Sequence, residues 1–200
     1  MAALPPSFVL YGGTALALRL AHRRSDDFDY FSNDPFLPHE IETGIPLLAG
    51  STRLRSSPNT LVSLIDRGGP VKVSFFGAVG LRRVADPDVS DDNGVAIASL
   101  LDLAATKVKV VQDRAEAKDY VDIDRLLSEG IDLSTAVAAA RAVYGPAFNV
   151  LLSLKALSFF DDGDLPTLPD VLRRRLIAAV RSTDPTRLPH VSPLPGGLRP

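Results

Sequence analysis

The chain has 200 residues, of which 46% are hydrophobic and 23% are charged, and its formal net charge is -2. This length and composition are typical of one globular domain, or of a domain with a helical extension. The absence of cysteine excludes disulfides, thiolate metal sites and a cysteine nucleophile. The small net charge gives no overall attraction to nucleic acid, and no apolar run is long enough to span a bilayer, so we expect a cytoplasmic protein.

A glycine turn near the start of the chain is the first informative feature. The apolar run over residues 8–11 predicts a strand, and Gly12-Gly13-Thr14 follows it directly. We expect Thr14 to be the N-cap of the next helix. A Gly-Gly turn lets backbone N–H groups approach a phosphate, and the N-terminus of the helix attracts the same anion. The turn is therefore a candidate phosphate-binding site.

Closely spaced acids lie on the next extended run, SDDFDYF. Because successive side chains of a strand point to opposite faces, Ser25, Asp27 and Asp29 share one face. Phe28 and Tyr30 project to the other face. Two neighbouring carboxylates are costly unless a cation or a proton lies between them, and Mg²⁺ or Mn²⁺ suits such a pair. We predict that Asp27 and Asp29 bind this metal; a solvated acidic strand edge is the alternative for the acids taken alone.

The glycine turn, the segment from His22 to Ser25 and the Asp27-Phe28-Asp29 run together carry a resemblance. The combination resembles the AbiEii/AbiGii-type nucleotidyltransferase toxins, members of the DNA polymerase β-like nucleotidyltransferase superfamily. The resemblance implies that the Gly-Gly-Thr turn contacts the nucleoside triphosphate and that the two acids hold the catalytic metal. It also assigns Arg24 and Ser25 to nucleotide binding, although Arg23 has the better spacing for the family's arginine.

Three further strands are predicted over residues 52–56, 60–66 and 71–76, because extended runs there are separated by turn residues. Such hairpins favour a mixed or antiparallel sheet. The superfamily usually carries a third carboxylate on a strand near the last of these runs, but neither of its faces offers an acid, and Ser74 stands at the corresponding position. Asp66 is the nearest substitute. We therefore expect a two-acid metal site, which weakens the case for full catalytic activity.

A second informative stretch is LLDLAATKVKVVQDRAEAKDYVDIDRLL. Apolar residues recur in it at helical spacing, and Lys107 and Arg114 lie two helical turns apart, nearly in line beside the apolar stripe. The stretch resembles the family's LAA-x-K segment followed by R-x-x-x-KD-x-x-D. By that resemblance Lys107 is a catalytic lysine that contacts the triphosphate, and Arg114 also binds the nucleotide. By the same resemblance Lys118, Asp119 and Asp122 line or brace the site, with Asp119 in a catalytic or supporting role. The i, i+4 spacing allows Asp122 to pair with Lys118.

Beyond this stretch the chain is predicted to be helical, and its end is rich in proline and glycine. We expect an α/β (α+β) fold with a polymerase β-like nucleotidyltransferase core and a small mixed sheet over residues 1–98. A helical region over residues 99–182 should complete the site. Residues 183–200 should form a disordered tail.

These features predict a metal-dependent nucleotidyltransferase that takes a nucleoside monophosphate from a nucleoside triphosphate. The resemblance implies that the acceptor is a hydroxyl of RNA, notably tRNA, or of protein. The resemblance also implies a toxin paired with an antitoxin, or an abortive-infection system, and no membrane partner. Two alternatives stay open. The first is an antibiotic-modifying or other small-molecule nucleotidyltransferase, which residues 107–122 argue against. The second is a catalytically impaired module that binds a nucleotide or a partner, which the missing third acid favours.

Overall fold

The computed structural model describes residues 4–91 and 93–198, which form two compact units. The first unit comprises the described residues of Met1–Leu81, Asp86–Ser99 and Pro195–Pro200. The second comprises Arg82–Ala85 and Leu100–Leu194. Arg82–Ala85 and the described residues of Pro195–Pro200 thus belong to a different unit from the residues before them. The chain therefore cannot be divided into its two units at a single position.

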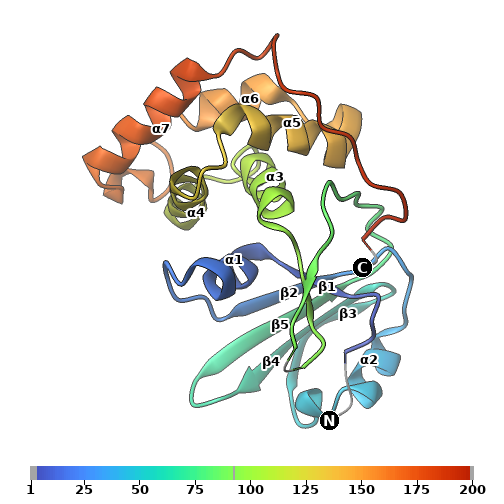
Figure 1. The fold of residues 1–200 in the computed structure, drawn as a ribbon. Coiled ribbons are helices and arrows are strands. Elements are labelled where there is room, and N and C mark those ends of the chain that lie inside the picture. Colours follow the sequence, from blue (N-terminus) through green and yellow to red (C-terminus); the bar gives the residue numbers. More distant parts are fainter. Residues whose placement is uncertain (1–3, 92, 199–200) are drawn as a thin grey trace. The chain divides into compact units, whose positions relative to one another are not determined.

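A mixed sheet of seven strands forms the first unit, in the order β3-β4-β5-β2-β1-β7-β6. The strands are β1 (Val9–Tyr11), β2 (Asp27–Phe31), β3 (Thr52–Ser57), β4 (Thr60–Asp66), β5 (Pro70–Phe76), β6 (Asp88–Val89) and β7 (Ala96–Ile97). Strands β3, β4 and β5 form an antiparallel meander, whereas β2 runs parallel to β5 and β1 parallel to β7 (Figure 1). The predicted α+β class and the mixed sheet are confirmed.

Helices cover both faces of this sheet. Helix α1 (Gly12–Leu20) lies on one face, and α2 (Pro38–Gly44) with a short 3-10 turn, η1 (Pro46–Leu48), lies on the other (Figure 1). On the face where Leu48 of η1 lies, the ring of Tyr30 stacks on Phe75 with centroids 5.2 Å apart. Because Tyr30 is held in this core, the alternate residues of β2 must project to the opposite face.

The start of α1 differs from the prediction. The helix begins at Gly12 and its N-cap is Tyr11, so Thr14 lies inside the first turn and is not the cap. The reason is conformational: Gly12 has a φ of 77°, a value that glycine adopts without strain. The chain therefore passes from β1 into the helix without the intervening residues that we expected.

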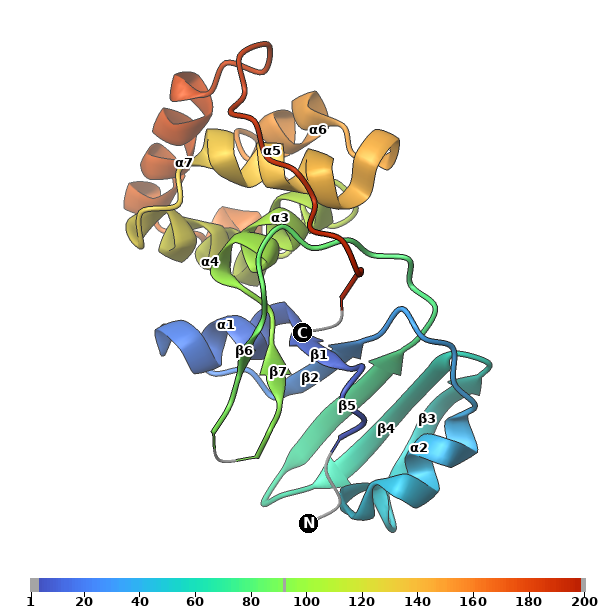
Figure 2. The ribbon, with the colours of Figure 1, turned by 45° about the vertical axis from the view of Figure 1, so that its right-hand side comes forward.

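Among the described residues of the second unit, all the regular elements are helices (Figure 2). They are α3 (Leu100–Val110), α4 (Ala117–Ser128), α5 (Leu133–Tyr144), α6 (Val150–Ala156) and α7 (Asp170–Ser182), with 3-10 turns η2 (Gly145–Ala147) and η3 (Leu165–Thr167). Helix α3 packs against α4 and α5, α4 against α7, and α5 against α6. Within the described residues, none of these helices has the length and apolar character needed to cross a membrane.

The Pro- and Gly-rich tail makes ordered contacts. As far as Leu198 it contains no helix or strand, yet Leu194 N donates to Arg83 O at 2.8 Å and Leu198 is only 1% exposed. The predicted disorder is wrong for these positions, because a buried leucine and a backbone hydrogen bond hold them. The last two residues of the expected tail, and residues 1–3 of the expected core, lie outside the described residues.

Candidate active site

The two glycines of the turn lie where other side chains approach the backbone. A Cβ at Gly12 would lie 3.0 Å from Asp29 Oδ2, and a Cβ at Gly13 would collide with the guanidinium of Arg23. Glycine therefore leaves space for a carboxylate at one position and for a cation at the next. The turn brings backbone N–H groups, the carboxylate of Asp29 and the guanidinium of Arg23 together at the start of α1.

Thr14 links the beginning of α1 to β2. Its buried hydroxyl donates to the carbonyl oxygen of Asp27 at 2.5 Å and lies 2.9 Å from Ser25 Oγ. Thr14, which we expected to cap the helix, thus connects α1 to β2 by hydrogen bonds. It fixes the distance between the glycine turn and the strand that carries the acids, and Ser25 contributes to the same link.

Asp27 and Asp29 lie on one face of β2, as predicted, and they face β5 in parallel register. Asp27 is the partner of Lys72, and Asp29 is the partner of Ser74. The two side chains of the first pair meet, with Lys72 Nζ 3.2 Å from Asp27 Oδ2. This lysine is not among the site residues predicted from the sequence. Its position two residues before Ser74, on the same face of the strand, was the available signal.

The donor set of this face fits a hard divalent cation. Two carboxylates on alternate residues of a strand, both partly exposed, suit Mg²⁺, which takes its remaining ligands from water and substrate phosphates. Ser74, beside Asp29, is only 2% exposed and brings no charge. Among the described residues, no three acidic, histidine or cysteine side chains are grouped to hold a metal. The proposed substitute, Asp66, accepts hydrogen bonds from Gly68 N and Gly69 N in its own turn.

Of the two neighbouring arginines, Arg23 lies at the glycine turn. Its guanidinium approaches Gly13, and Nη1 donates to the carbonyl oxygen of Arg24 at 3.0 Å. The side chain of Arg24 is 88% exposed and pairs with Asp26 at 3.0 Å. The geometry therefore favours Arg23 as the basic residue of the turn, while the role of Arg24 stays a prediction from the resemblance.

In the second unit, four of the residues singled out in the sequence converge. Lys107 Nζ lies 2.7 Å from Asp119 Oδ1 and 2.6 Å from Asp122 Oδ2. Arg114 Nε lies 2.8 Å from Asp119 Oδ2. We call these four residues the buried ion cluster. Asp122 thus pairs with Lys107, and Lys118 pairs with Glu116 at 2.8 Å.

The path of the chain through this cluster corrects one expectation. Helix α3 ends at Val110 and α4 begins at Ala117, so Lys107 and Arg114 do not lie in line on one helix. Arg114 belongs to the connection between them, and it reaches Asp119 because the connection turns the chain back. The two cations approach the same carboxylate from different elements.

The electrostatics of Asp119 keep it ionised. Burial alone raises the pKa of this carboxyl, but the hydrogen bond from Arg114 and the charge of Lys107 outweigh the burial and hold the pKa below its ordinary value. A carboxylate with a lowered pKa is a weak base and is not protonated at neutral pH. Asp119 is therefore suited to orienting the two cations, and unsuited to proton transfer.

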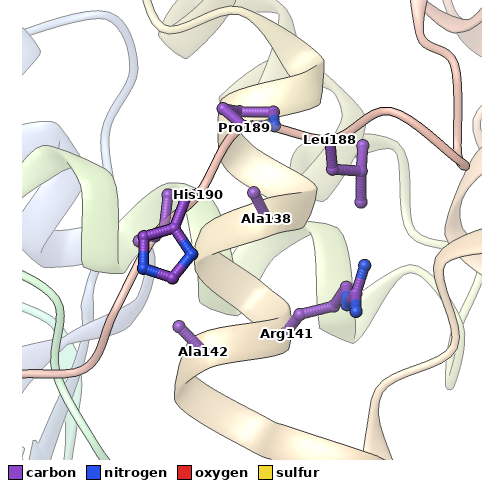
Figure 3. Close-up of a pocket in the computed structure, with 7 residues that line it drawn as sticks. Ala138, Arg141, Ala142, Leu188, Pro189 and His190 are labelled. Atoms are coloured by element: carbon purple, nitrogen blue, oxygen red, sulfur yellow. The ribbon is translucent and has the colours of Figure 1, made fainter.

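A separate pocket in the second unit contains none of the predicted site residues. It has a volume of about 330 Å³ and lies between α5 and the tail. Figure 3 shows Ala138, Arg141 and Ala142 of α5 facing Leu188, Pro189 and His190 of the tail. The small alanine side chains leave the space, and the tail closes one side of it.

Comparison with known proteins identifies the family. A family model described as the nucleotidyl transferase AbiEii toxin of type IV toxin–antitoxin systems matches residues 1–192. The chain belongs to the AbiEii nucleotidyltransferase toxin family. The match includes every predicted site residue of this AbiEii chain and confirms the family resemblance. An uncharacterized protein of Aquifex aeolicus (strain VF5) is 32% identical over 168 residues, which cover 82% of this chain and 79% of that protein.

Proposed function

We propose that this AbiEii family member transfers a nucleoside monophosphate from a nucleoside triphosphate to a hydroxyl of RNA, notably tRNA, or of a protein. The reaction uses Mg²⁺ or Mn²⁺ and takes place in the cytoplasm, where the chain acts as the toxin of a toxin–antitoxin or abortive-infection pair. The observation that carries the proposal is the position of the Asp27/Asp29 pair next to the glycine turn, where the Cβ of Gly12 would lie 3.0 Å from Asp29 Oδ2.

In the first unit, the two carboxylates would bind the metal, and the glycine turn and Arg23 would bind the nucleotide. Asp27 and Asp29 would hold a divalent ion, which neutralises phosphate charge and polarises the reacting phosphoryl group when bound. The N–H groups at the start of α1 and the guanidinium of Arg23 bind the anionic triphosphate. The acceptor hydroxyl oxygen forms a bond to the α-phosphorus as the bond from that phosphorus to the bridging oxygen breaks. Pyrophosphate leaves, and the hydroxyl proton passes to water.

The residues of the buried ion cluster remain proposed participants. Lys107 and Arg114 are proposed to bind the nucleotide, as the resemblance implies. The ion pairs between Lys107 and the two carboxylates support a role for Asp119 as the residue that orients both cations. In that role Asp119 acts through its neighbours, and a conservative Asp119→Asn change should lower transfer by lowering nucleotide affinity.

Transfer of radioactive label tests the proposal. Each of the four nucleoside triphosphates labelled at the α-phosphate is incubated with total RNA or total protein, Mg²⁺ and either the wild type or Asp29→Asn. We expect label on one polymer with the wild type and a loss of at least about 100-fold in the variant, because the metal loses one of its two carboxylates. Asp161→Asn, which changes an exposed aspartate outside the site, is the matched control and should transfer normally.

A second candidate is a module that binds a nucleotide or partner without turnover. It is favoured by one observation, the lack of a third acid near the pair among the described residues. Binding of labelled nucleotide without transfer to RNA, protein or an aminoglycoside would support this candidate. Transfer to the aminoglycoside alone would instead support a small-molecule nucleotidyltransferase.

A further inference from the structure

A lysine occupies the carboxylate face of the sheet. Lys72 on β5 is the cross-strand partner of Asp27, and its ammonium lies 3.2 Å from Asp27 Oδ2. On its other side, the partner of Lys72 on β4 is Leu64, which carries no charge. The ammonium therefore meets an acid on one side and an apolar residue on the other, and it pairs with Asp27.

The ion pair between Lys72 and Asp27 contributes little to the stability of the fold. The side chain of Lys72 is 39% exposed and that of Asp27 is 47% exposed. Ion pairs exposed to this degree contribute about 0–1 kcal/mol to folding. A cation that contributes so little to folding, but lies beside a candidate metal ligand, has its main effect on the charge of the site.

The charge of this face suggests what the lysine does. A site with three carboxylates and two divalent ions carries one net positive charge. Asp27, Asp29, one divalent ion and Lys72 would carry the same net charge, so a lysine beside the neutral Ser74 can take the place of a third acid together with a second ion. An ammonium group also donates hydrogen bonds to phosphate oxygens.

We propose that Lys72 replaces a second metal ion in this site, so that the chain binds its nucleotide with one divalent ion and the Lys72 ammonium. The proposal rests on the proposed function and specifies its charge requirement. Before the nucleotide binds, Lys72 pairs with Asp27 and competes with the metal. When the triphosphate is bound, the ammonium contacts its oxygens.

Binding measurements on the full chain test this role without requiring turnover. Bound Mn²⁺ is counted by equilibrium dialysis with saturating α,β-methylene analogues of the four ribonucleoside triphosphates. We expect one Mn²⁺ per wild-type chain. Without nucleotide, Lys72→Gln should bind Mn²⁺ about fivefold more tightly, since Asp27 loses a competing partly exposed cation. With Mn²⁺ present, the same variant should bind the analogue at least about tenfold more weakly.

Two further variants make the result specific. Lys72→Arg keeps the positive charge and should bind Mn²⁺ and the analogue within about threefold of the wild type. Lys155→Gln removes an exposed lysine of α6 and should change neither affinity. Two Mn²⁺ ions per wild-type chain would overturn the proposal, and so would a Lys72→Gln protein in which either affinity is unchanged. Failure of label transfer by the wild type would instead count against the proposed function, since the dialysis experiment measures binding alone.

Discussion

At the residue scale, the site depends on positions without side chains as much as on its charged groups. Gly12 combines a φ of 77° with a close approach of Asp29 Oδ2. Gly50 has a φ of 76° but no atom within 4 Å of its Cβ position. Both glycines therefore have a backbone conformation that strains other residues, but only at Gly12 would a side chain also meet a neighbouring atom. Substitutions at the two positions distinguish the effect of backbone strain from the effect of this contact.

Gly12→Ala should lose both stability and activity, whereas Gly50→Ala should lose stability alone. Each variant places alanine in the left-handed region at a cost of about 1–2 kcal/mol. In Gly12→Ala the new methyl group also moves Asp29, so we expect label transfer to fall at least about tenfold. Urea denaturation and the transfer assay measure the two effects. Equal activity in the two variants would show that the approach of Asp29 to the turn is unimportant.

At the element scale, the connection between α3 and α4 creates the buried ion cluster. Nothing in the sequence VQDRAE marks a helix break, since it contains neither proline nor glycine. The chain leaves the helical path after Val110, and Arg114 then pairs with Asp119 from outside the helix. Tertiary context overrides local helix propensity here, and the sequence alone therefore predicted two cations in line on one helix.

Lys107→Met should destabilise the protein strongly. The variant leaves Asp119 and Asp122, both with fully buried side chains, without the ammonium that lies within 2.7 Å of each. Loss of one partner of a buried pair costs about 3–5 kcal/mol. Lys109→Met, which removes the partner of the exposed Asp113, should cost less than about 1 kcal/mol. The free energies of unfolding in urea measure the difference, and similar values for the two variants would contradict a buried cluster.

The stability of the same variant should depend less on acid. The pKa of Asp119 in the folded protein lies below its unfolded value, so the carboxylate stabilises the fold above the unfolded pKa. This contribution is lost as the pH falls through the folded pKa. Lys107→Met removes one charge that lowers this pKa, so the folded and unfolded pKa of Asp119 lie closer together, and the variant should lose less stability than the wild type between neutral and acid pH. Urea midpoints between neutral pH and about pH 3 test the shift; parallel curves would contradict it.

At the scale of the whole molecule, local patterns predicted most of the elements. The meander over β3, β4 and β5 was found within one residue at each end, because turn residues separate its runs. Strand alternation likewise placed Asp27 and Asp29 on one face. Alternation also placed Lys72 on the face of Ser74, but its pairing with Asp27 was not predictable, because that pairing depends on the parallel register of two strands that the meander separates in sequence.

Composition misled the prediction for the end of the chain. Proline and glycine favour disorder, but a single buried side chain is sufficient to hold a segment in place. Leu198→Ala should lower the free energy of unfolding by about 2–3 kcal/mol, because this leucine is only 1% exposed. Leu151→Ala, at a position that is 62% exposed, should change it by less than about 0.5 kcal/mol. Thermal unfolding of the two variants provides the comparison, and equal midpoints would mean that the tail is not packed.

The most direct test of the central claim is to identify the phosphorus that is attacked. Wild-type protein and Mg²⁺ are incubated with RNA or protein acceptor and a nucleoside triphosphate labelled either at the α- or at the γ-phosphate. Nucleotidyl transfer predicts that the α-label becomes attached to the acceptor and that the γ-label appears only in pyrophosphate. Attachment of the γ-label would make the chain a phosphotransferase. Attachment of neither label, with nucleotide binding intact, would contradict the proposed catalytic role of Asp27 and Asp29.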